Sequence, residues 1–175
     1  MLAQLGIPFR VVPSTAREIH EPGGNAPSIA EINASAKARQ VAQELPNSLV
    51  LGADTLVFTE KEVWGKPRDL ADAEGMLLRL SGRIHRVVTA VCLMQREPSK
   101  QRTFAEITEV TFRNLSLTEI RAYLGSINPL DKAGAYAIQE NGDAIVHSIT
   151  GSYSNVVGLP MERLKTELAA WGRAT

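Results

Sequence analysis

The sequence predicts an α/β or α+β domain with a mixed sheet, on three observations. Short apolar runs typical of buried strands are interspersed with segments whose apolar residues recur at helical spacing. The length of 175 residues suits one domain, folded as two lobes around a cleft. No internal repeat or low-complexity tract interrupts the pattern, which argues against a repeat architecture.

The N-terminal part of the chain predicts four segments. In order, they are the last turn of a helix over Met1–Leu5 with Gly6 as its C-cap, a strand over Phe9–Pro13, a loop over Ser14–Ser28 and a helix over Ile29–Glu44. Gly and Pro in the loop disfavour regular structure there. Ser28 and Glu31 have the spacing of a capping box at the helix start. The buried face of this helix is predicted from the spacing of Ile29, Ile32, Ala36 and Val41.

The middle of the chain predicts most of the sheet. The expected strands are a buried one over Ser48–Leu51, a hairpin between Leu56–Phe58 and Val63–Trp64, and an antiparallel pair over Arg86–Met94 and Phe104–Phe112. Between them, Asp69 has the position of an N-cap for a helix that runs to Leu80 and ends before Gly82. The inward face of that helix is predicted to hold Ala73, Met76, Leu77 and Leu80.

The C-terminal part predicts short elements and a closing helix. Ser116 and Glu119 have the spacing of a second capping box, at the start of a helix that runs to Leu124. A loop and short strands are predicted over Asn128–Gln139 and Ala144–Ile149. Pro160 has the position of a helix start, and the helix is completed over Met161–Trp171.

Composition argues against several classes of protein. Lys plus Arg and Asp plus Glu both number 19, so the formal net charge is zero, which disfavours charge-driven binding to nucleic acid or to an anionic membrane. The only cysteine, Cys92, lies in an apolar run and is predicted to be a small core residue. No apolar run is long enough to span a membrane and no signal segment opens the chain, so a cytoplasmic location is expected. The three histidines show no metal-ligand spacing, so a zinc site is not expected.

Asp54 is the first candidate for chemistry. It directly follows a predicted buried strand, and ligands of open α/β sheets bind beyond the carboxyl ends of strands. A carboxylate in that place can hold a divalent cation or take a proton from water. An aspartate that caps a helix or stabilises a turn has the same local sequence. The position alone therefore leaves both interpretations open.

Lys66, Lys132 and Gln139 are candidate ligand contacts. Lys66, held between Gly65 and Pro67, is either a phosphate contact or a solvated loop lysine. Lys132 precedes small residues that let a ligand approach the main chain, although a tight turn has the same composition. A buried amide at Gln139 needs hydrogen-bond partners, which the edge of a nucleobase can supply.

Three acidic residues and one polar segment each allow two interpretations. Glu18 and Glu21 lie in the Gly- and Pro-rich loop, where an acid is either solvated or close to a bound cation. Glu109 lies within a predicted strand and is either exposed or paired with a specific partner. The segment Gly151–Asn155 is either an anion-binding turn or a polar entry to a helix.

Five sequence blocks follow one another along nearly the whole chain. They are LGADT at Leu51–Thr55, WGKP at Trp64–Pro67, LSGRIH with VTAV at Leu80–His85 and Val88–Val91, DKAGAYAIQ at Asp131–Gln139, and GSYSNVVGLP at Gly151–Pro160. Together and in this order they resemble the Maf family of nucleoside triphosphate pyrophosphatases. Five ordered blocks are far more specific than any one of them.

The resemblance implies a fold and an activity. The fold is α/β, with a mixed twisted sheet, flanking helices and two lobes around a nucleotide-binding cleft. The activity is hydrolysis of a nucleoside triphosphate to the monophosphate and pyrophosphate with a divalent cation, usually Mg²⁺. The Tyr136–Gln139 pattern resembles the branch that acts on dTTP and UTP. Homodimers are common in the family, and no nucleic-acid or membrane partner is expected.

The resemblance also implies roles for individual residues. Asp54 corresponds to the proton acceptor for the attacking water and to a metal-site residue. The residues expected near the phosphates are Lys37, Lys66 and Lys132. Those expected to select the base are Thr55 and Gln139. Glu18 matches an acid that holds metal, although Arg17 stands where the family often has another acid, and Glu109 matches an acid of a recurrent Thr-Glu-Val strand.

The N-terminus departs from the family pattern. Residues 1–175 are expected to form a single Maf-like domain that lacks the family's first strand and its Ser-x-Ser-Pro-Arg-Arg loop, because Met1 falls just before the Leu5–Phe9 block. One hypothesis is that in-frame sequence upstream of Met1 encodes both. The alternative is a shortened paralogue, catalytically weak or inactive, that acts by binding, for instance in cell-division arrest.

Overall fold

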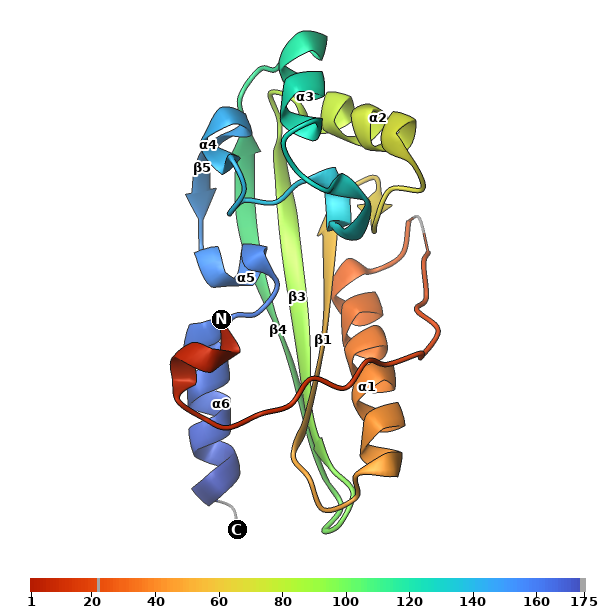
Figure 1. The fold of residues 1–175 in the computed structure, drawn as a ribbon, viewed down its shortest axis with the longest axis vertical. Helices are drawn as coiled ribbons and strands as arrows, with labels where there is room; N and C mark the ends of the chain where they lie inside the picture. Colours follow the sequence, from red (N-terminus) through yellow and green to blue (C-terminus); the bar gives the residue numbers. More distant parts are fainter. Residues whose placement is uncertain (22, 174–175) are drawn as a thin grey trace.

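A computed structural model describes residues 1–21 and 23–173, so Pro22 of the predicted loop lies outside the described residues. A five-stranded sheet forms the centre, in the order β2-β1-β3-β4-β5. The strands are β1 (Val50–Phe58), β2 (Val63–Trp64), β3 (Ile84–Gln95), β4 (Lys100–Phe112) and β5 (Val146–Thr150). The α/β class with flanking helices is confirmed (Figure 1). All four pairings in the described sheet are antiparallel rather than mixed, and short turns that reverse the chain join β1 to β2 and β3 to β4.

Two predicted hairpins are confirmed. The pairing of β1 with β2 sets Val57 opposite Trp64, and β3 pairs with β4 along the whole of its length. From Val87 to Met94 every residue of β3 is buried, because helices cover both faces of this central strand. A strand that is buried on both faces needs a continuous run of apolar residues, and such a run can be recognised in the sequence.

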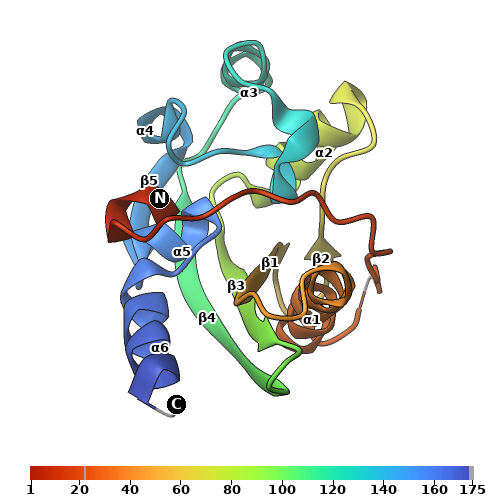
Figure 2. The ribbon, with the colours of Figure 1, turned by 60° about the horizontal axis from the view of Figure 1, so that its bottom comes forward.

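The helices form a layer on each face of the sheet. Helix α1 (Ala26–Glu44) packs on the face that carries Val88, Ala90 and Cys92, which confirms the core position of the cysteine. The opposite face carries Val87, Val91 and Leu93. It is covered by α2 (Leu70–Leu80), α3 (Leu117–Leu124) and α6 (Met161–Arg173) (Figure 2). None of the helices described in residues 1–21 and 23–173 has the length and apolar character needed to cross a membrane.

The N-terminal segment contains less regular structure than predicted. Leu2–Leu5 forms a 3₁₀ turn that ends at Gly6 with φ 65°, as the glycine C-cap requires. The predicted strand over Phe9–Pro13 is wrong, because residues 7–21 form neither helix nor strand and cross in front of the sheet (Figure 1). Phe9 and Val11 are exposed, so this segment has β-forming residues without a neighbouring strand to bond them.

Helix α1 begins earlier and faces differently than predicted. Asn25 is the N-cap and accepts a hydrogen bond from the Ser28 amide, so the predicted Ser28–Glu31 capping box is wrong. Ile32 is 51% exposed, whereas small residues of the helix face the sheet. A Cβ on Gly52 of β1 would lie 2.4 Å from the Ala34 carbonyl oxygen, so α1 and β1 are in backbone contact there. That close approach requires small residues at Ala34 and Ala38, while Ile29 and Val41 of the predicted face are buried as expected.

The predictions for α2 and α3 are confirmed. Asp69 caps α2, and the four predicted inward side chains of that helix are buried. Ser116 and Glu119 form the predicted capping box of α3. Beyond α3 a strand is confirmed over part of Ala144–Ile149, as β5, whereas none forms over Asn128–Gln139. The chain here consists of short elements. They are the 3₁₀ turns η2 (Pro129–Asp131) and η3 (Ala133–Ala135), then α4 (Gly142–Ile145), β5 and α5 (Tyr153–Val157).

Candidate functional site

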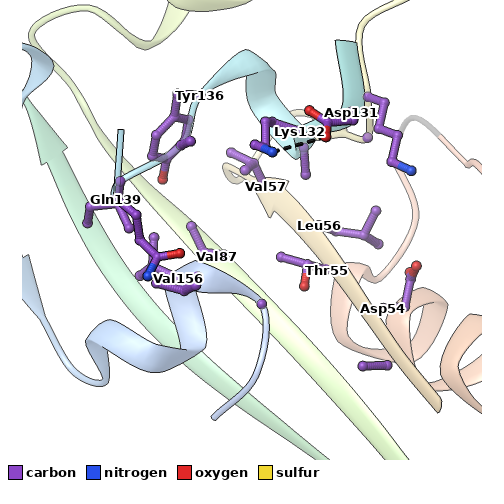
Figure 3. Close-up of a pocket in the computed structure, with 18 of the residues that line it drawn as sticks. Asp54, Thr55, Leu56, Val57, Val87, Asp131, Lys132, Tyr136, Gln139 and Val156 are labelled. Carbon is purple, nitrogen blue, oxygen red and sulfur yellow. Dashed lines mark hydrogen bonds and ion pairs between the residues drawn. The ribbon is translucent and has the colours of Figure 1, made fainter. Parts of the chain in front are cut away.

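A cavity of about 430 Å³ lies along β1, between the α1 side and the segment 131–140. It is lined by seven of the residues that the sequence predicts for the site, namely Glu18, Lys37, Asp54, Thr55, Lys66, Lys132 and Gln139. Figure 3 shows Asp54 and Thr55 on one side of this space and Gln139 with Val156 across from them. Residues far apart in the sequence therefore meet in one place.

Asp54 lies in the middle of β1, opposite Ala90, and not at the end of a strand as predicted. It still reaches the cavity, because β2 pairs with β1 only at Val57 and Phe58. In the described part of the chain no strand covers the edge of β1 beside Asp54. Side chains from both faces of β1 can therefore line the same cavity at this open edge.

The Asp54 carboxylate is 7% exposed and has two partners from α1. Its Oδ1 lies 2.6 Å from Lys37 Nζ, and its Oδ2 accepts a hydrogen bond of 3.0 Å from Asn33 Nδ2. Asn33 and Lys37 are four residues apart and so share one face of the helix. Helix α1 thus fixes the orientation of the carboxylate from one side.

Lys37 also contacts Glu18, at 2.8 Å between Nζ and Oε1, so one ammonium joins two carboxylates. Burial acts to lower the pKa of Lys37, but its hydrogen bonds to Asp54 and Glu18 outweigh burial and raise that pKa. Burial acts to raise the pKa of Glu18, but the bond to Lys37 and the charges of Lys37, Lys66 and His20 outweigh it and lower that pKa. Lys37 and Glu18 are therefore charged at neutral pH.

Asn33 is a site residue that the sequence analysis missed. Its Oδ1 accepts from the Ile19 amide at 2.8 Å, and its Nδ2 donates to the Ile19 carbonyl at 3.2 Å as well as to Asp54. It therefore ties the irregular segment that carries Glu18 to the centre of the site. The sequence feature that could have indicated Asn33 is its place as a polar residue in an alanine-rich helix, one turn before Lys37.

Lys66 and Lys132 lie on two loops that are bonded to each other. The Gly134 amide donates to the Gly65 carbonyl at 3.0 Å. Gly134 has φ 67°, and a Cβ there would lie 2.8 Å from Val57, so only glycine fits this contact with β1. Lys132 forms an ion pair with Asp131, drawn as a dashed line in Figure 3. Its Nζ lies 3.0 Å from Asp131 Oδ2 and 3.8 Å from Glu140 Oε1. The two loops place positive charge at the rim of the cavity.

A buried hydrogen-bond network fixes the direction in which Thr55 bonds. Thr89 Oγ1 donates its only proton to the Asn155 carbonyl at 2.8 Å, and it lies 2.9 Å from Thr55 Oγ1. Thr55 must therefore donate to Thr89, which leaves its oxygen as an acceptor for a ligand. Gln139 is exposed, so the expectation of a buried amide is wrong. Within the described residues its carboxamide makes no hydrogen bond, so both its donor and its acceptor are available.

Two other candidates lie outside the cavity. Glu109 forms an exposed ion pair with Arg86 at 3.0 Å, which settles its two interpretations in favour of pairing on the surface. Ser152 caps α5 by accepting from the Asn155 amide at 3.2 Å, so the Gly151–Asn155 segment is a polar helix entry. Asn155 itself is fully buried and donates to the Val87 carbonyl and the Thr108 hydroxyl.

Glu18 and Asp54 are compatible with a divalent cation. Both carboxylates approach the same point of positive charge, which Lys37 Nζ occupies at 2.8 and 2.6 Å. Residues 1–21 and 23–173 contain no cluster of three or more His, Cys, Asp or Glu side chains that could hold a metal alone. A pair of carboxylates completed by phosphate oxygens is the usual arrangement for Mg²⁺.

Comparison with known proteins gives a consistent result. The family model described as Maf-like protein matches residues 1–171. A dTTP/UTP pyrophosphatase of Akkermansia muciniphila is 44% identical over 161 residues, which are 92% of this chain and 84% of the relative. A dTTP/UTP pyrophosphatase of Moorella thermoacetica is 46% identical over 175 residues, covering 98% of this chain and 89% of the relative. The order of the motifs, the single cavity that their residues line and these matches together place the chain in the Maf-like protein family.

Proposed function

We propose that this protein is a nucleoside triphosphate pyrophosphatase that hydrolyses dTTP and UTP to the monophosphate and pyrophosphate. The observation that carries the proposal is the Lys37–Asp54 contact of 2.6 Å inside a cavity that also holds Glu18, Lys66 and Lys132. A buried carboxylate, a lysine against it and further lysines at the rim are what a triphosphate and an attacking water require. The relatives named dTTP/UTP pyrophosphatase support the same activity.

In this proposal Asp54 takes the proton from the attacking water. Asn33 and Lys37 hold its two oxygens at 3.0 and 2.6 Å, so the carboxylate is oriented before substrate binds. Lys66 and Lys132 bind the phosphates, since an ammonium can neutralise charge on the departing pyrophosphate.

Asp54 and Glu18 would hold the divalent cation, which we propose is Mg²⁺. When bound, such a cation neutralises phosphate charge and makes a nearby water more acidic. One positive group, Lys37 Nζ, already contacts both carboxylates. Pyrophosphate release should therefore cease in the presence of a chelator and return when Mg²⁺ is added in excess.

The base is selected by Thr55 and Gln139. Thymine and uracil carry an imide edge with one N–H donor between two carbonyl acceptors. Gln139 can pair with both kinds of group, and Thr55 offers an acceptor because its proton is used by Thr89. Cytosine has no proton on the corresponding ring nitrogen, so an acceptor that faces that nitrogen finds no donor there.

The test is a pyrophosphate-release assay on the purified chain with dTTP, UTP, CTP, ATP and GTP. Each substrate is assayed with Mg²⁺ and with chelator. We expect kcat/KM for dTTP and UTP to exceed that for the other three by at least about tenfold. Release from none of the five, or faster release from ATP or GTP, would overturn the proposal.

A further inference from the structure

The turn that carries Gln139 has little support from its own sequence. The Glu140 amide donates to the Ala137 carbonyl at 3.2 Å, which closes a turn with Gln139 as its third residue. The segment belongs to no strand, and Ala135 just before it has φ 64°, a conformation that alanine rarely adopts. Contacts from outside the segment must therefore impose its shape.

Tyr123 of α3 supplies such a contact at the start of the turn. Its hydroxyl donates to the Ala137 carbonyl at 3.0 Å and accepts from the Ala137 amide at 3.0 Å. The side chain is 3% exposed and does not line the cavity. One phenol oxygen thus satisfies both main-chain groups of the residue two positions before Gln139.

A second contact from the end of α3 holds the other side of the turn. Asn141 Nδ2 donates to Ser126 Oγ at 3.0 Å, and Ser126 Oγ in turn donates to the Tyr123 carbonyl at 2.8 Å. Asn141 has φ 54°, a left-handed conformation that asparagine tolerates better than most residues, and its side chain is held by Ser126. Gln139 lies midway between the two residues that α3 holds, Ala137 and Asn141.

Tyr136, the residue before Ala137, is also held in place, but by contacts in the core. Tyr136 Oη lies 2.9 Å from His85 Nε2, and both rings pack edge-on against Phe112. This contact fixes where the segment leaves the core, whereas the contacts of α3 decide how the following turn is placed. The position of Gln139 thus depends on a helix that does not touch the cavity.

We infer that the end of α3 acts as a clamp on the Gln139 turn and so sets the base selectivity of the site, with Tyr123 as its main positioning residue. This inference rests on the proposed function, because it assigns to Gln139 a contact with the base. Without the clamp the Gln139 side chain is still present, but its carboxamide can adopt several positions. Selectivity between bases then falls, while the groups around Asp54 are unchanged.

The experiment compares wild type with Tyr123→Phe, Ser126→Ala and Tyr153→Phe. Tyr153 is exposed at the start of α5, so its variant removes the same hydroxyl from a place where it has no role in the turn. For each protein we measure kcat and KM for dTTP and CTP, and amide hydrogen exchange over residues 137–141. We expect Tyr123→Phe to lower the dTTP-to-CTP ratio of kcat/KM by about tenfold through a higher KM for dTTP. Exchange over the turn should be about tenfold faster.

The outcomes separate this inference from the proposed function. An active wild type whose selectivity ratio is unaltered in folded Tyr123→Phe would overturn the clamp. So would an unaltered exchange rate, whatever the activity. If Tyr123→Phe does not fold, the solvent-exposed Ser126→Ala variant must show the same changes to a smaller degree, and their absence would overturn the clamp. A wild type inactive on every triphosphate would instead overturn the proposed function, and the exchange data would still decide whether α3 holds the turn.

Discussion

Lys37 Nζ lies 2.6 Å from Asp54 Oδ1 and so joins the middle of α1 to the middle of β1. The contact is possible because helix and strand approach closely one turn away, where Ala34 and Ala38 face Gly52. The geometry of the site therefore depends on packing between small residues.

Gly52→Ala should distort the site through packing alone. The added Cβ would lie 2.4 Å from the Ala34 carbonyl oxygen and 2.8 Å from the Ala38 amide nitrogen, which are main-chain atoms that cannot rotate away. We expect a loss of about 1–3 kcal/mol in the free energy of unfolding. Urea denaturation measures it. The matched control is Gly75→Ala in α2, where nothing lies within 4 Å and stability should rise slightly. Equal effects at the two glycines would contradict the close approach of α1 and β1.

His85 should make the protein less stable in mild acid. Burial lowers its pKa from 6.5 to about 4. Between those values the unfolded chain binds the proton more tightly, so the stabilisation is present above pH 6.5 and is lost as pH falls toward 4. We expect a loss of about 3 kcal/mol from this group between pH 7 and pH 4.

The measurement is the free energy of unfolding against pH for wild type, His85→Phe and His147→Phe. Phe at position 85 keeps an aromatic ring but cannot titrate, so the acid-dependent loss should shrink by most of that amount. His147 is exposed, and its variant should follow the wild-type curve. A His85→Phe curve parallel to wild type would show that other groups cause the acid sensitivity.

Thr55→Val should reduce discrimination between uracil and cytosine. Valine keeps the shape of threonine but removes the oxygen that faces the ligand. We expect the UTP-to-CTP ratio of kcat/KM to fall by about tenfold, and the fall to arise mainly from slower use of UTP. Thr118→Val on the exposed side of α3 is the matched control and should leave the ratio unchanged. Selectivity that survives in folded Thr55→Val would mean that Thr55 does not meet the base.

Local signals in the sequence were enough for much of the fold. Asp69 and Ser116 marked helix starts through caps that act within three residues, and β3 was recognisable because both of its faces are buried. The strand expected at Phe9–Pro13 failed for a non-local reason. A strand needs a neighbour, and no described residue of the chain supplies one.

The site was predicted residue by residue but not in its geometry. Asp54, Lys66, Lys132 and Gln139 were found through motifs and Lys37 through the resemblance to the family, and all line one cavity. The placement of Asp54 within a strand and the role of Asn33 could not be found, since both depend on how α1 packs against the open edge of β1. The direction of the hydrogen bond that Thr55 makes likewise depends on Thr89 and Asn155, which are distant in sequence.

In the proposed reaction Asp54 takes the proton from the attacking water, so the decisive measurement is pyrophosphate release from dTTP by Asp54→Asn. The amide keeps the shape of the carboxylate and can still accept from Lys37, but it cannot take up a proton. Asp143→Asn, at an exposed position of α4, is the matched control. We predict that kcat falls at least about 100-fold in Asp54→Asn while the variant stays folded at the assay temperature, with some loss of stability because its amide nitrogen faces the Asn33 Nδ2 donor, and that Asp143→Asn matches wild type. A folded Asp54→Asn variant that turns over dTTP at close to the wild-type rate would show that Asp54 is not the proton acceptor.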